Sequence, residues 1–299
     1  MKRLVLLAIL LSSINICFAQ TLPQSAVTLQ IVVDDADGTL PDNVVNHIYN
    51  KLSNLLTKNG MQSYNGQNQF YISAALLTQT KDILPGPPTQ IKEVMDLVLY
   101  IGDQYNELVF SSTTLTIQGV GVTPEKCYLN AIANVKANAP ELVEFLQEGK
   151  KKIVNYYNQQ ASTMLKKAKN LSAKHNYDEA IWLLMSVPSD CESYDQVLQQ
   201  AVAIYLEKLK YECLQNLTFA KTVWMTGCDK ESAKQAAVYL SLIYPDSECY
   251  EDAKKLYEEI KIRLNGDLNF DLNKDEDEVQ QADLVAAMRA LAAKYEENL

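Results

Sequence analysis

The sequence predicts an α+β fold: a small α/β sandwich domain with the element order β-α-β-β-β-α, followed by an all-α domain of helical hairpins. Three observations support this prediction. Before about residue 150, short apolar segments alternate with polar residues at the period of strands. After that point, apolar residues recur at helical spacing. A short turn joins the last two predicted strands as an antiparallel hairpin, and the element order indicates a small sheet with its helices on one face.

The first predicted strand and helix have distinct patterns. Residues 27–33 alternate apolar and polar side chains, as in a half-buried strand. Pro41 then stands where a helix begins, and the apolar residues from Val44 to Leu56 follow a helical period. Gly60 ends this helix. A β-α unit therefore opens the first domain.

Three strands are predicted next, over residues 70–76, 95–101 and 108–120. A proline-rich loop at 85–88 separates the first two, and the turn at 102–106 makes the last two a hairpin. The Gly119-Val120-Gly121 turn leads into a helix that Thr123 caps. Glycines before a helix sometimes bind phosphate, but this turn lacks a dinucleotide fingerprint, so a tight strand-to-helix turn is the stronger interpretation.

The predicted order of strands and helices resembles that of the amino-terminal domain of TolB and of the related domains of the curli secretion channel and of penicillin-binding-protein activators. The stretch that carries the resemblance runs from Leu97 through Gly119-Val120-Gly121 to Ala131, with Cys127 where those domains have an alanine. The resemblance implies a docking surface in residues 20–153.

Residues 154–264 are predicted to form the helical domain. The small Ala168, followed by Tyr177 and Ala180, resembles the tetratricopeptide repeat. The segment 180–191 is echoed by 237–249 at an offset of 57 residues, with a helix over about 194–214 and a loop near 222–228 between the copies. A plain helical bundle is the alternative to stacked hairpins.

Residues 1–19 have the three parts of a secretory signal peptide. Lys2 and Arg3 precede an uncharged, mainly apolar run, and Cys17-Phe18-Ala19 places small residues where a signal peptidase cleaves. The run is short for a membrane anchor, and Ile16 is a poor residue before a lipidated cysteine. The junction at the end of the predicted signal peptide, Phe18-Ala19-Gln20, resembles that of secreted proteins of Bacteroidetes-type bacteria. We therefore expect export to the periplasm, the outer-membrane periphery or the extracellular space, with no transmembrane segment after cleavage.

Charge and cysteine content narrow the function. A net charge of −10 argues against nucleic-acid binding and against a polybasic contact with anionic lipid. An oxidising compartment would allow up to two disulfides among the four cysteines of the second half, in three pairings, and buried free thiols are the alternative. These candidates are Cys191, Cys213, Cys228 and Cys249.

The segment after residue 264 divides into an acidic linker, 265–278, and an amphipathic helix, 279–299. The linker holds oxygen-bearing side chains at the spacing of a calcium-binding loop, but Leu272 stands where that loop needs glycine, so a solvated linker is the stronger interpretation. The weak candidate ligands are Asp267, Asn269, Asp271, Asn273, Asp275 and Glu278.

No catalytic motif stands out, and we expect neither a cofactor nor an enzymatic activity. His47 and His175 are the only histidines, and neither has the spacing of a zinc or protease site.

Tyrosines outnumber phenylalanines 17 to 6, and such residues serve either helix packing or a binding face. The candidate binding face is Tyr177, Tyr205 and Tyr239. We therefore expect an exported, non-catalytic protein that binds a protein or peptide of the cell envelope. An envelope enzyme acting on cell wall or glycan, and a self-assembling structural subunit, are the alternatives.

Overall fold

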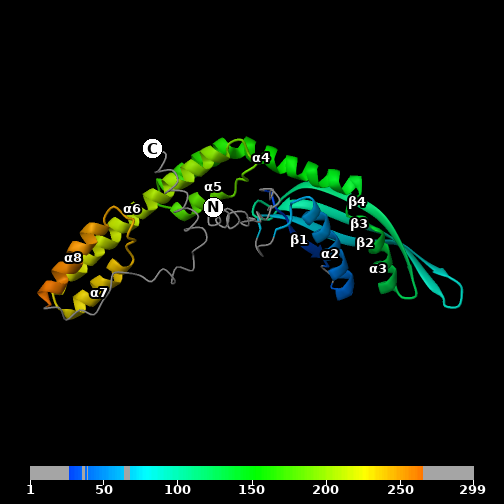
Figure 1. The fold of residues 1–299 in the computed structure, drawn as a ribbon, viewed down its shortest axis with the longest axis horizontal. Coiled ribbons are helices and arrows are strands. Elements are labelled where there is room, and N and C mark those ends of the chain that lie inside the picture. Colours follow the sequence, from blue (N-terminus) through cyan, green and yellow to red (C-terminus); the bar gives the residue numbers. More distant parts are fainter. Residues whose placement is uncertain (1–26, 36–37, 39, 64–67, 265–299) are drawn as a thin grey trace, which may run out of the picture. The chain divides into compact units, whose positions relative to one another are not determined.

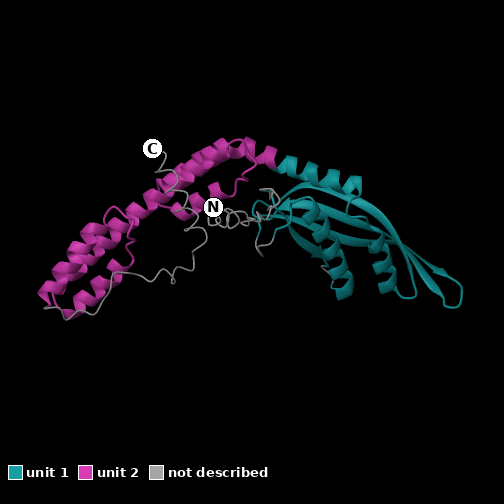
Figure 2. Ribbon diagram, viewed as in Figure 1, with its two compact units in different colours: residues 1–153 teal, residues 154–299 magenta. Residues whose placement is uncertain are grey.

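The computed structural model describes residues 27–35, 38, 40–63 and 68–264. The chain divides into two compact units, residues 1–153 and 154–299 (Figure 2). The helix α4 (Pro140–Ser172) runs through the boundary between Ile153 and Val154. The signal peptide, the acidic linker and the carboxy-terminal helix that the sequence predicts lie outside the described residues.

The first unit confirms the predicted α+β class. Its sheet has the order β1-β2-β3-β4, in which β1 runs parallel to β2 and the other pairs are antiparallel. In chain order the elements are β1 (Gln30–Asp34), α2 (Asp42–Lys58), β2 (Phe70–Leu84), β3 (Gln90–Asp103), β4 (Leu108–Gly121) and α3 (Pro124–Asn134). Figure 1 shows α2 and α3 on the same side of the sheet. The strands β2 and β3 are longer than predicted and continue as an exposed hairpin to the proline-rich loop.

One face of the sheet holds the core of this unit. Met95, Leu97, Leu99 and Ile101 alternate along β3, and each is at most 4% exposed. The apolar stripe of α2 faces Leu97 and Leu99, and Cys127 and Ala131 of α3 pack on Met95. Burial of each such side chain contributes about 2 kcal/mol, so the period-2 and period-3.6 patterns together determine which face is covered.

The turn from β4 to α3 is a packing device. A Cβ atom on Gly119 would lie 2.0 Å from the carbonyl oxygen of Cys127, and one on Gly121 would lie 2.5 Å from its amide nitrogen. The side chain of Thr123 accepts a hydrogen bond from the amide of Lys126 and caps α3, as predicted. Both glycines are therefore required because the strand and the helix approach closely, which supports the interpretation of this segment as a tight turn.

The second unit is helical throughout its described part. After the end of α4 it contains α5 (Tyr177–Met185), α6 (Tyr194–Gly227), α7 (Lys230–Ser241) and α8 (Tyr250–Arg263). The loop predicted near 222–228 is wrong, because α6 continues to Gly227. The hydroxyl groups of Thr218, Thr222 and Thr226 donate to carbonyl oxygens four residues earlier, which leaves the helix intact.

The internal repeat is present, but its structural offset is 56 residues, not 57. The α5–α6 and α7–α8 connections are closed by equivalent backbone hydrogen bonds, and Tyr250 corresponds to Tyr194. The amide-to-carbonyl pairs are Val187 to Leu184, Cys191 to Pro188 and Tyr194 to Cys191, matched by Ile243 to Leu240, Ser247 to Tyr244 and Tyr250 to Ser247. The sequence comparison aligned identical Ala and Pro residues and so gave an offset of 57. The backbone hydrogen bonds of the two turns show that structurally equivalent residues are 56 apart.

Candidate functional site

The outer edge of β4 presents unpaired backbone groups. The amide of Val120 donates to the side-chain oxygen of Asn130 at 3.1 Å, so it points away from β3. The register with β3 is regular from Gly121 to Ser111. Because amides alternate in direction along an antiparallel strand, those of Ser112, Thr114, Thr116 and Gln118 also face outward. Nothing in the described ranges accepts a hydrogen bond from these four amides.

This edge lacks the usual protection against strand pairing. The 14 residues of β4 include no charged residue and no proline. Its one irregularity lies at Phe110, near the start of the strand, and the pairing is regular from Ser111 to Gly121. By contrast, β1 has five residues, and the distal part of β2 carries Lys81, Asp82 and a register shift between Thr78 and Thr80. Charges, irregularities and short length are what natural proteins use to block edge pairing. Of the edges that the structure describes, β4 is therefore the one suited to receive another strand.

A groove of about 380 Å³ runs beside this edge. Leu115 and Ile117 on β4 line it with the segment that joins α3 to α4 and with the first turn of α4. Lys136 and Glu141 are exposed residues of this lining. The apolar residues of the other wall are Val135, Ala139 and Leu142. The groove therefore offers apolar contact beside backbone groups that can form a ladder.

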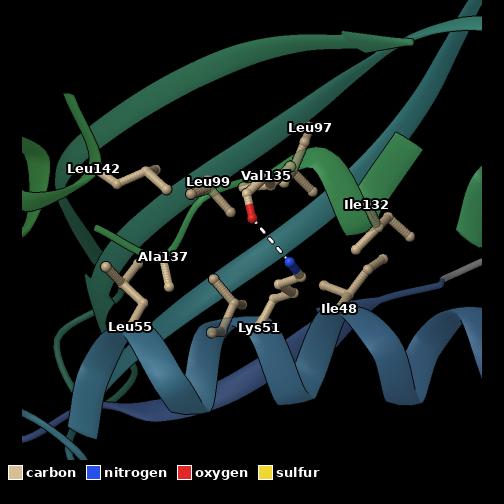
Figure 3. Close-up of a pocket in the computed structure, with 10 residues that line it drawn as sticks. Ile48, Lys51, Leu55, Leu97, Leu99, Ile132, Val135, Ala137 and Leu142 are labelled. Carbon is tan, nitrogen blue, oxygen red and sulfur yellow. Dashed lines mark hydrogen bonds between the residues drawn. The ribbon is translucent and has the colours of Figure 1, made fainter. Parts of the chain in front are cut away.

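A second, much smaller cavity of about 20 Å³ lies between α2 and the sheet (Figure 3). Its lining is apolar apart from Lys51, whose amine donates to the carbonyl oxygens of Ala133 and Val135 at 2.9 Å each. These carbonyls end α3, so Lys51 caps that helix. The space is about that of one water molecule, and it is too small for a ligand.

The candidate tyrosine face does not form. Tyr177 is 9% and Tyr205 is 5% exposed, and both pack inside the helical unit. Tyr239 is half-buried, and its ring lies 5.4 Å from that of Phe219. These placements fit the packing alternative, because rings that fill helix interfaces offer little area to a partner.

Tyr177 belongs to a polar aromatic cluster at the α4–α5 turn. His175, which has a positive φ of 61°, stacks on Tyr211 at 4.1 Å, and its Nδ1 lies 2.9 Å from the Tyr177 hydroxyl. Burial, followed by the charge of Glu207, raises the pKa of Tyr177. Glu207 accepts a hydrogen bond from Ser172 at 2.5 Å. These groups bind one another, so the cluster ties α4 and α5 to α6.

Two of the four candidate cysteines are joined in a disulfide. Cys213 on α6 is bonded to Cys249, which precedes α8, with a Cα–Cα distance of 6.0 Å. Cys191 and Cys228 are free thiols, so the second expected disulfide is not formed. Burial raises the pKa of Cys191 to about 11 and also raises that of Cys127. Cys127 donates to the carbonyl oxygen of Gly119 at 2.9 Å, and a buried thiol of raised pKa is a poor nucleophile.

Metal sites and membrane spans are absent from the part of the chain that the structure describes. Residues 27–264, without the gaps given above, contain no group of three or more His, Cys, Asp or Glu residues that could hold a metal ion. The candidate calcium loop at 267–278 lies outside these residues. No described helix has an apolar stretch long enough to cross a bilayer.

Comparisons with known proteins identify no family. No family model matches the sequence, and no curated protein is similar to it. Among solved structures, a minor lipoprotein from Acinetobacter baumannii is 15% identical; the match covers 47% of this chain and 94% of that one, with a TM-score of 0.24. A likeness of that size carries no argument about function, and the TolB-like and tetratricopeptide-like resemblances stay predictions.

Sequence reasoning did not identify the β4 groove. The signal was available in part, since the segment from Leu108 to Gly121 is long, rich in β-branched residues and uncharged. That β4 stands at an edge, however, depends on the order of strands in the sheet.

Proposed function

We propose that this protein is an exported, non-catalytic binding protein that receives an extended peptide segment of a partner along β4. One observation carries the proposal: an uncharged strand of 14 residues leaves four outward amides without an acceptor among the described residues, beside a groove of about 380 Å³. Strand addition satisfies such groups through main-chain hydrogen bonds, and a flanking pocket selects alternate side chains. The disulfide between Cys213 and Cys249 is consistent with export.

The geometry defines what the peptide must offer. A peptide beside β4 would pair its backbone with Thr114, Thr116 and Gln118. Every second side chain would then lie on the same face as Leu115 and Ile117, so an apolar residue fits there. Each backbone hydrogen bond contributes about 1 kcal/mol net, so affinity requires several of them together with the apolar contact.

The test uses proline on β4 of the full chain. Decapeptides selected from a displayed random library on the wild-type protein serve as probes. Because the Thr116 amide faces outward, Thr116→Pro removes a docking donor without removing a hydrogen bond to β3. We expect peptide affinity to fall at least about tenfold in Thr116→Pro, and to change little in the matched Thr116→Ala variant, which keeps the amide.

Hydrogen exchange supplies the second measurement. A bound peptide should slow amide exchange at Thr114, Thr116 and Gln118 of the wild type, while the thermal midpoint of Thr116→Pro shows that the unit is folded. Undiminished binding by a folded Thr116→Pro protein would contradict the proposal. So would a wild-type dimer that Thr116→Pro converts to monomer, because a second copy would then occupy the edge.

A further inference from the structure

The carboxy-terminal part of α4 and the turn after it carry a concentrated positive charge in an acidic protein. The chain has a net charge of −10, yet it has no Asp or Glu between Gly149 and Asn176. Within the second unit this stretch contributes four exposed lysines over nine positions. They are Lys166, Lys167, Lys169 and Lys174, and we call them the basic face.

Helical geometry places the lysines of α4 away from the core. Ala161 and Ala168 are buried at 4% and 0% exposure, and they mark the side of α4 that packs inside the unit. At 100° per residue, Lys166, Lys167 and Lys169 each lie at least 100° around the helix from Ala168. Solvent therefore surrounds the amines, and they are available to a partner.

Within the described residues the basic face has no ion pair, whereas most lysines elsewhere in the same unit have one. Six of those lie within 4.0 Å of a carboxylate: Lys208, Lys210, Lys234, Lys254, Lys255 and Lys261. No side chain of the basic face forms an ion pair or hydrogen bond with any described residue. Two nearby carboxylates are engaged elsewhere, since Asp178 binds Lys208 and Glu207 binds Ser172, each at 2.5 Å.

We propose that the basic face binds an acidic polypeptide segment of a partner protein. Lysine amines are compact, strongly hydrated charges, and four of them along about 12 Å match the carboxylates of three or four residues of an extended chain. A short segment senses only charges within a Debye length of about 8 Å. A membrane or a nucleic acid would contact a larger part of the protein surface than a short peptide does. The net charge of −10 would therefore repel these polyanions more strongly. The basic face shares no residue with the β4 groove, and this inference does not depend on the proposed function.

The experiment measures the binding of fluorescein-labelled hexaglutamate to the full chain by fluorescence anisotropy, at low and at physiological salt. The test variant changes the basic face to glutamine (K166Q, K167Q, K169Q and K174Q). The matched control removes the same charge from four ion-paired lysines (K210Q, K234Q, K254Q and K255Q). We expect affinity to fall about tenfold or more in the test variant and less than about twofold in the control, and to weaken with salt.

Three outcomes would overturn this inference: no binding of hexaglutamate by the wild type, equal losses in both variants, or tighter binding of phosphatidylglycerol vesicles or of an oligonucleotide through the same four lysines. Carbodiimide crosslinking followed by mass spectrometry should place the peptide carboxylates on the basic face. Thr116→Pro should retain hexaglutamate binding, so this experiment and the β4 peptide experiment can fail independently.

Discussion

Replacing the disulfide of the helical unit by Cys213→Ala and Cys249→Ala should destabilise that unit by about 4 kcal/mol. The two cysteines are 36 residues apart, and closing a loop of that length removes about 13 cal/mol/K of entropy from the unfolded chain. With a urea dependence of about 2 kcal/mol/M, the unfolding midpoint should fall by about 2 M.

The assay follows the fluorescence of Trp224, which is 2% exposed and belongs to the same core cluster as both cysteines. The chain has two tryptophans, so Trp182→Phe in every variant makes Trp224 the sole reporter. Reduction of the parent protein should lower its midpoint to near that of the double variant, and Cys228→Ala should leave the midpoint almost unchanged. A loss below about 1 kcal/mol would refute the reasoning, since the cross-link would then constrain the unfolded chain little.

Gly119→Ala should destabilise the first unit by about 3 kcal/mol in chemical denaturation, because its Cβ atom would lie 2.0 Å from the carbonyl oxygen of Cys127; an unchanged midpoint would be inconsistent with the close approach. Hydrogen bonds from the α7 amino terminus lower the pKa of Asp229, so the stability that it contributes is present above the carboxyl's ordinary pKa of 3.8 and is lost as pH falls through the lower folded value. Asp229→Asn should remove that component from an acid titration followed by circular dichroism, and an unaltered titration would speak against the cap. In the native protein at pH 8, a thiol reagent should modify half-buried Cys228 well before Cys191, whose pKa of about 11 and burial protect it; equal rates measured by mass spectrometry would count against this order.

Local patterns predicted much of the fold. Alternating apolar residues identified β1 to β4, and helical spacing identified α2, because burying the wrong face would leave these side chains in water. The Thr123 cap before Pro124 was predicted from residue type alone, since it depends on neighbours in the chain. The continuity of α6 was not predicted, because threonine-rich segments are ambiguous until their hydroxyl groups find acceptors.

The candidate sites depended on distance in space. The sequence by itself determined the helical and strand periods, the caps and the stretch without acidic residues that contains the basic face. Only the tertiary structure decided that Cys213 pairs with Cys249, that Tyr177 and Tyr205 are buried, and that β4 is an edge. Periods and caps arise from contacts within a few residues, whereas disulfide pairing, burial and edge position depend on which distant segments become neighbours, and a single sequence does not encode those distances locally.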